Sequence, residues 1–78
     1  MDLPEWDGTP SRWKRYRREV QWFVRGTKQD ERKHVVARLL PGLSGSAKDT
    51  VMLWNADDFE LDEGGGVFLK RLSETALG

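Results

Sequence analysis

Residues 6–24 read WDGTPSRWKRYRREVQWFV, and this stretch decides the fold. Its apolar side chains recur at the spacing of an α-helix and fall within about 100° of one another around the helix axis. These side chains are Trp13, Tyr16, Val20, Phe23 and Val24. An amphipathic helix of this kind owes most of its stability to tertiary packing, so we expect the rest of the chain to cover its apolar face.

The residues at both ends of this helix suit their positions. Thr9 is able to accept a hydrogen bond from a free amide of the first turn. Pro10 fits the first helical position because its missing N–H is not needed there. Gly26 favours the left-handed conformation in which many helices end. We therefore expect the first helix at about residues 10–25.

Trp22 lies outside this apolar face. It is about 180° from Trp13 on the helical wheel, in the half that carries basic side chains. Those basic side chains are Lys14, Arg15, Arg18 and Arg25. Either another segment of the chain covers Trp22 or a partner does. In the second case Trp22, with its arginine neighbours, forms a self-association or partner-binding surface.

Two more helices are expected in the middle of the chain. The first of them runs from about residue 28 to 40 and ends at Pro41-Gly42. The next covers about residues 45–55, with Ser44 or Ser46 as its N-cap.

The two ends of the chain complete the expected fold. A fourth helix is placed at about residues 62–76, and it contains Gly64-Gly65-Gly66, which costs roughly 1 kcal/mol per glycine in a helix interior. These glycines either fray the helix or allow close packing. At the other end, residues 1–8 form an extended lead-in whose Leu3 and Trp6 need a groove on the folded body for burial.

The apolar positions of the four helices form one expected core. Its members are Trp13, Tyr16, Val20, Phe23, Val36, Leu39, Leu40, Leu43, Ala47, Val51, Trp54, Phe68, Leu69 and Leu72, with Leu53 as a further inward candidate. The sequence shows no strand-length alternation of β-branched residues. We therefore expect residues 1–78 to form one all-α domain, a compact four-helix bundle with an extended N-terminal lead-in.

Composition favours a protein that is not exported. The start of the chain has no signal-peptide pattern, and no apolar run approaches the roughly 18 residues that span a bilayer. We expect an intracellular, cytoplasmic protein without membrane contact. Its charge is uneven, with ten Lys and Arg against six Asp and Glu up to Arg38, and three against seven from Leu39 onward. Such a dipolar domain is able to pair its basic end with the acidic end of a neighbour.

Nothing in the sequence indicates an enzyme, a metal site or a bound cofactor. The chain has no cysteine, and its one histidine, His34, has no nucleophile or further ligands spaced around it. The glycine run does not indicate phosphate binding, because Glu60, Asp62 and Glu63 precede it and repel phosphate. One alternative is a weak RNA contact, since the first helix interleaves basic and aromatic residues. These are Arg12, Lys14, Arg15, Arg17 and Arg18 with Trp13 and Tyr16.

Several of these motifs stand in an order that points to a known family. They are Pro4-Glu5-Trp6-Asp7-Gly8, then Trp13, Tyr16, Val20 and Trp22, then Leu39-Leu40, and then Leu43-Ser44-Gly45-Ser46-Ala47. Together they resemble the Gag capsid amino-terminal domain of long-terminal-repeat retrotransposons, over nearly the whole chain. In that family an aromatic-acidic-Gly turn precedes a tryptophan-bearing first helix, and a Leu-x-Gly-x-Ala step opens a later helix.

The resemblance implies an all-helical lobe that self-associates with other Gag chains around element RNA and has no catalytic activity. It assigns Trp6 to docking the lead-in, Trp13 and Tyr16 to the core, and Gly45 and Ala47 to the close-packed start of the third helix. Related Gag-like proteins hold peptides in an apolar groove near this lead-in. A monomeric peptide-binding adaptor with a groove around Trp6 is therefore the alternative function.

Overall fold

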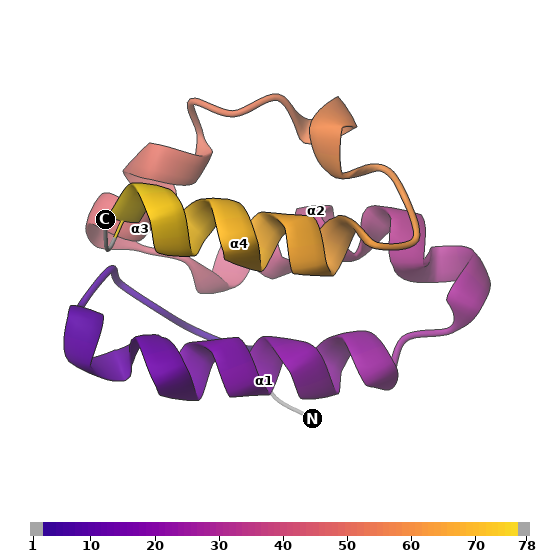
Figure 1. Ribbon diagram of the computed structural model, residues 1–78, viewed down its shortest axis with the longest axis horizontal. Coiled ribbons are helices and arrows are strands. Elements are labelled where there is room, and N and C mark those ends of the chain that lie inside the picture. The colour runs from indigo at the N-terminus through magenta and orange to yellow at the C-terminus, as the bar shows by residue number, and fades with distance from the viewer. Residues whose placement is uncertain (1–2, 77–78) are drawn as a thin grey trace.

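The computed structural model describes residues 3–76, and this part of the chain is helical without any strand, which confirms the all-α prediction (Figure 1). It contains four α-helices and four short 3-10 helices. The α-helices are α1 (Trp13–Arg25), α2 (Val35–Leu39), α3 (Gly45–Val51) and α4 (Gly64–Ala76). The 3-10 helices are η1 (Pro10–Arg12), η2 (Gln29–His34), η3 (Leu40–Gly42) and η4 (Ala56–Phe59).

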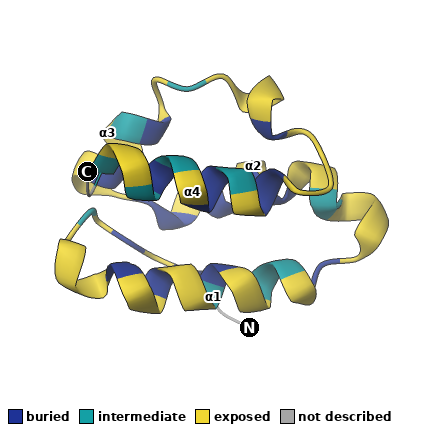
Figure 2. Cartoon of the chain, viewed as in Figure 1, coloured by how far each residue is buried: buried dark blue, intermediate teal, exposed yellow. Residues whose placement is uncertain are grey.

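Helix α4 is the centre of the fold and contacts each of the other three α-helices. It runs antiparallel to α1 along one side, while α2 and α3 pack behind it (Figure 1). The connection from α3 to α4 passes over the side of α4 that faces away from α1. Figure 2 shows that the buried residues of α1 face α4 and that its other side is exposed.

The first helical segment begins as predicted at Pro10, with η1 leading directly into α1, but Thr9 does not cap it through its side chain. The Thr9 hydroxyl and amide instead donate to Asp7 Oδ1, at 2.6 and 2.9 Å. These two hydrogen bonds, the one from the hydroxyl more than the one from the amide, hold the pKa of the Asp7 carboxyl below its ordinary value, because both favour the charged form. The side chain of Asp7, and not that of Thr9, is therefore the acceptor in the turn before the helix.

The end of α1 is also different from the prediction. Gly26 has a φ of −79°, so it is right-handed and not left-handed. Its amide donates to Trp22 O at 3.0 Å, which continues the helical pattern for one more residue. The hydroxyl of the buried Thr27 then donates to Phe23 O at 2.8 Å and satisfies a free carbonyl of the last turn.

The second predicted helix, at 28–40, is divided into η2, α2 and η3. Segment η2 contains no buried residue, so it has no apolar face that would hold a regular α-helix against the body. Regular α-helix appears only at Val35–Leu39, where three apolar side chains are buried. The N-cap residue of η2, Lys28, makes no capping hydrogen bond with its side chain.

The third predicted helix is shorter than expected, because α3 ends at Val51 and not near residue 55. Asn55 is extended, and its side chain accepts from the Asp57 amide at 3.1 Å to begin η4. Neither predicted serine caps α3 with its side chain: Ser44 occupies the N-cap position without that bond, and Ser46 Oγ donates to Asp7 O at 3.4 Å.

The expected core residues gather in one cluster around α4. Eleven of the fourteen are buried, and Phe23, Leu40 and Trp54 are partly buried against them. Leu53 does not belong to the core, since it is 87% exposed. The core also contains Trp6, Val35 and Phe59, and Pro4 is fully buried as well. Two aromatic groups hold it together, Trp6–Trp13–Tyr16 and Trp54–Phe59–Phe68.

Candidate protein-interaction surfaces

The lead-in docks against the body through the backbone of Trp6. Its amide donates to Gly42 O and its carbonyl accepts from the Ser44 amide, both at 3.0 Å, which makes an isolated parallel bridge with Leu43. The indole is 3% exposed, and its Nε1–H donates to Thr9 O at 2.9 Å. Trp6 therefore fills the groove expected around it, so that position is closed to a peptide from another protein.

An open groove does exist beside the docked lead-in, with a volume of about 780 Å³. It lies between residues 3–5 and the outer side of η1 and α1. Its lining residues are Leu3, Pro4, Glu5, Arg12, Arg15, Tyr16, Glu19 and Trp22. Leu3 is only half-buried in this groove.

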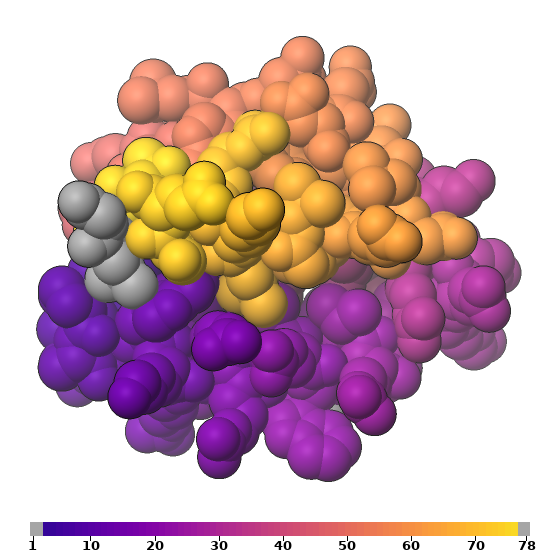
Figure 3. Space-filling view, in the orientation of Figure 1, coloured from indigo at the N-terminus to yellow at the C-terminus, as the bar shows by residue number. Residues whose placement is uncertain are grey.

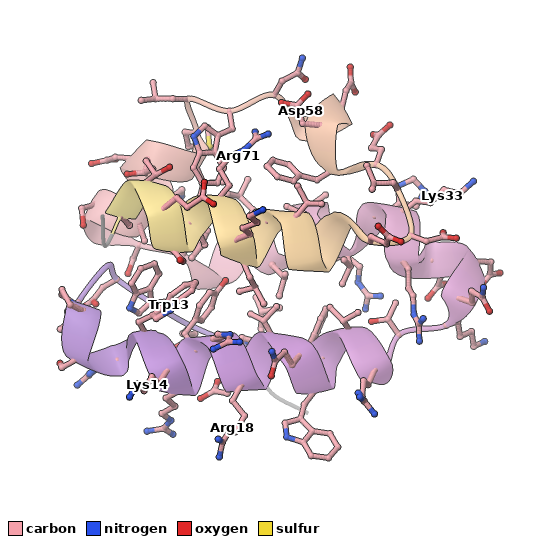
Figure 4. The ribbon with its side chains drawn as sticks, in the orientation of Figure 1. Trp13, Lys14, Arg18, Lys33, Asp58 and Arg71 are labelled. Atoms are coloured by element: carbon pink, nitrogen blue, oxygen red, sulfur yellow. The ribbon has the colours of Figure 1, made fainter. Side chains whose placement is uncertain are left out.

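Trp22 lines this groove, and 63% of its area is exposed to solvent. No segment of residues 3–76 covers it fully. The predicted basic neighbours all lie around it: Lys14, Arg15 and Arg18 on one side, and Arg18 and Arg25 on the other. Figure 4 shows Lys14 and Arg18 pointing away from the body of the protein, whereas Trp13 points inward.

This basic surface carries little compensating charge. Residues 8–29 contain seven Lys and Arg and a single acidic residue, Glu19. Glu19 pairs with Arg15 at 2.9 Å, but the Arg15 side chain is 86% exposed, so the pair contributes little to stability. We call Trp22 with Lys14, Arg15, Arg18 and Arg25 the Trp22 surface.

The RNA alternative loses its aromatic component in this fold. Trp13 and Tyr16 are 9% and 1% exposed, so neither ring is available to stack on a base. What remains for RNA is the row of basic side chains on α1, together with Trp22. Such a surface supports salt-sensitive phosphate contacts, with Trp22 as the one strongly exposed ring among these residues.

A second surface was missed by the sequence interpretation. Met52 and Leu53 are 61% and 87% exposed in the turn after α3, and Leu61 is 38% exposed before α4. The surrounding segment, residues 49–69, contains six Asp and Glu and no Lys, Arg or His. The signal for this surface was the helical wheel of α3, on which Ala47, Val51 and Trp54 form the inward face and Leu53 does not.

Tyr16 has a buried hydroxyl without a hydrogen-bond partner among the described residues. Burial raises the pKa of this phenol, since the charged form loses its hydration, and the nearby Glu19 charge acts in the same direction. An unpaired buried hydroxyl costs about 1–3 kcal/mol of desolvation. The group is therefore a weak point of the core.

Tyr16→Phe is expected to raise the free energy of unfolding at neutral pH by about 1 kcal/mol, because it removes the unpaired hydroxyl and keeps the ring. A second effect follows from the raised folded-state pKa. Wild-type stability falls as pH rises past about 10, where tyrosine in the unfolded chain ionises. Urea unfolding of both proteins between about pH 7 and 11 measures this, and the variant should not share that part of the loss.

The chain has one tyrosine, so tyrosinate absorbance titrates this group alone. Ionisation of folded wild-type protein near pH 10 would contradict the buried position of the hydroxyl.

Residues 3–76 provide no group of three or more His, Cys, Asp or Glu side chains that could hold a metal ion. The same residues include no helix that is both long and apolar enough to cross a membrane. His34 is exposed at the end of η2.

Comparison of the chain with protein-family models, with curated proteins and with solved structures found no match.

Proposed function

We propose that this chain is a non-enzymatic structural module, a retrotransposon Gag-like capsid lobe that self-associates in the assembly of a cytoplasmic particle. The observation that carries the proposal is the 63% exposure of Trp22 in a ring of basic side chains. Tryptophan and arginine are enriched among the residues that dominate protein–protein binding energy.

The resemblance on which the proposal rests agrees with the positions of its motif residues. Trp6 docks the lead-in, and Trp13 and Tyr16 lie in the core beside it. At the start of α3, Gly45 has a φ of +55°, and a Cβ there would lie 3.0 Å from Asp7 O. Ala47 is 1% exposed in the same turn. A glycine and a small residue are thus needed where the family motif has them.

The test is the molar mass of the protein in solution as its concentration rises. Light scattering coupled to size-exclusion chromatography, from micromolar to near-millimolar protein, should show growth for the wild type. Trp22→Ala should reduce that association at least about tenfold, the effect expected of a residue worth about 1.4 kcal/mol or more. Glu74→Ala, an exposed change on α4, is the control and should behave as the wild type.

Circular dichroism must show the same helical content in all three proteins. A wild type that stays monomeric throughout would argue against self-association by this chain. It would favour the adaptor alternative instead, with the open groove beside Leu3 and Pro4 as the peptide site.

A further inference from the structure

An interface built on the Trp22 surface needs a partner surface that is both apolar and acidic. A second Trp22 surface does not meet that need, because it would bring two sets of four Lys and Arg together. Like charges across an interface cost several kcal/mol. A symmetric contact of α1 with α1 is therefore unfavourable, and the complement of the Trp22 surface has a different composition.

The chain itself carries such a complement. Met52 and Leu53 are the two most exposed large aliphatic side chains of the described residues. Six carboxylates accompany them in the segment without bases, and these are Asp49, Asp57, Asp58, Glu60, Asp62 and Glu63. Asp58 pairs with Arg71 at 3.2 Å, and the other five form no ion pair with the described residues (Figure 4). We call Met52 and Leu53 with these carboxylates the Leu53 surface.

The two surfaces lie on opposite sides of the protein. In Figure 3, α1 occupies one side and the residues between α3 and α4 the other, with α4 between them. A contact between them therefore joins two different surfaces, and the resulting pair keeps one surface of each kind free. Such a contact adds further copies and produces a ring or an open chain, whereas a symmetric contact would stop at a dimer.

We propose that the Trp22 surface of one copy binds the Leu53 surface of a second copy, so that copies associate head to tail. This inference rests on the proposed self-association and specifies the surfaces that carry it. Trp22 provides an aromatic ring for the Met52 and Leu53 side chains, and the arginines around it face the carboxylates of the neighbour. Charge complementarity of this kind fixes orientation and speeds encounter.

The size of the two surfaces predicts a weak contact. The protein measures 31 × 26 × 19 Å, and the two surfaces lie at opposite ends of the middle dimension (Figure 1). The whole face at either end thus has a cross-section on the order of 600 Å², and each surface covers part of it, against roughly 800 Å² per partner in a standard stable interface. Association in the micromolar to millimolar range is expected, which sets the concentrations needed for the test.

Mixing two variants separates this arrangement from other kinds of self-association. Trp22→Ala disables one surface and Leu53→Lys the other, and both positions are exposed enough that the fold is retained. Each variant alone should remain largely monomeric by light scattering at concentrations where the wild type grows. A mixture should form a 1:1 pair through the two intact surfaces and go no further. Thr75→Lys adds the same charge on α4, outside both surfaces, and should grow like the wild type.

The outcomes distinguish this inference from the proposed function. If the wild type grows and Leu53→Lys grows equally well, the Leu53 surface is not the partner, and self-association stands. If both variants are monomeric but their mixture gives no pair, the head-to-tail arrangement is wrong. A wild type that stays monomeric up to near-millimolar protein overturns both proposals.

Salt provides a second readout on the wild type. Raising ionic strength from about 0.1 to 1 M shortens the screening length from about 10 to 3 Å, so the average mass should fall. A mass that rises or stays unchanged would overturn the role of the opposite charges.

Discussion

Trp6→Ala is expected to lower the free energy of unfolding by about 3–5 kcal/mol, the usual cost of removing a large buried aromatic side chain. A domain of this size has a total stability of roughly 5 kcal/mol. The variant should therefore be largely unfolded, or close to it, at room temperature. This is the largest effect of a single substitution that we predict.

The reason lies in the number of contacts that meet at this one side chain. The indole stacks on Tyr16 with ring centroids 5.5 Å apart and lies 5.0 Å from the ring of Trp13. Its Nε1–H also holds the Thr9 carbonyl at the start of the first helical segment. Removal of the ring leaves a cavity between the lead-in and α1. The backbone hydrogen bonds of Trp6 with Gly42 and Ser44 are then no longer supported by side-chain packing.

Urea unfolding followed by circular dichroism measures the loss, and Trp22→Ala provides the matched control. It is the same substitution at a tryptophan that is 63% exposed, so it should change stability by no more than about 0.5 kcal/mol. Equal costs for the two substitutions would show that the lead-in is not part of the core.

The sequence predicted the elements that depend on apolar periodicity. Helix α1 has its expected bounds once η1 is included, because Tyr16 and Val20 recur at helical spacing. The details of the helix ends were predicted less well. Thr9 was expected to accept from an amide, yet Asp7 is close enough to take both Thr9 donors. Local propensity does not decide between two competing acceptors in one turn.

The candidate interaction surfaces were predicted only in part, for a related reason. The pattern showed that Trp22 is off the apolar face, but not whether another segment covers it. Coverage depends on where the lead-in runs. Trp6 fixes it to the Gly42–Ser44 backbone, so that residues 3–5 line the groove beside Trp22 without covering it. Leu53 is exposed because α3 ends at Val51 and the chain turns there, whereas the sequence pattern placed the end of this helix near residue 55.

The glycine run of α4 gives the last prediction, a pair of substitutions of opposite sign. Gly64→Ala should lower the free energy of unfolding by about 1–3 kcal/mol, the usual cost of forcing an extra carbon into a packed site. Gly66→Ala should raise it by up to about 1 kcal/mol. The two positions are two residues apart in one helix and receive the same methyl group, so each controls for the other.

The difference in sign follows from what the new Cβ would meet. At Gly64 it would collide with the carbonyl oxygen of Phe59, which is backbone and has little freedom to move. At Gly65 it would lie 2.8 Å from Cγ2 of Val24, so this glycine lets α4 approach α1 closely. At Gly66 nothing lies within 4 Å, and the methyl group simply removes flexibility from the unfolded chain.

Thermal unfolding by circular dichroism resolves the pair, because each kcal/mol moves the midpoint of a domain this size by about 4–8 °C. Gly64→Ala should melt below the wild type and Gly66→Ala above it. If both variants melt higher, α4 does not approach Phe59 as closely as described. If both melt lower, Gly66 is not in the open position assigned to it. Opposite shifts would mean that the glycines differ in role. Gly64 and Gly65 allow α4 to pack closely in the centre of the bundle, whereas Gly66 can be replaced.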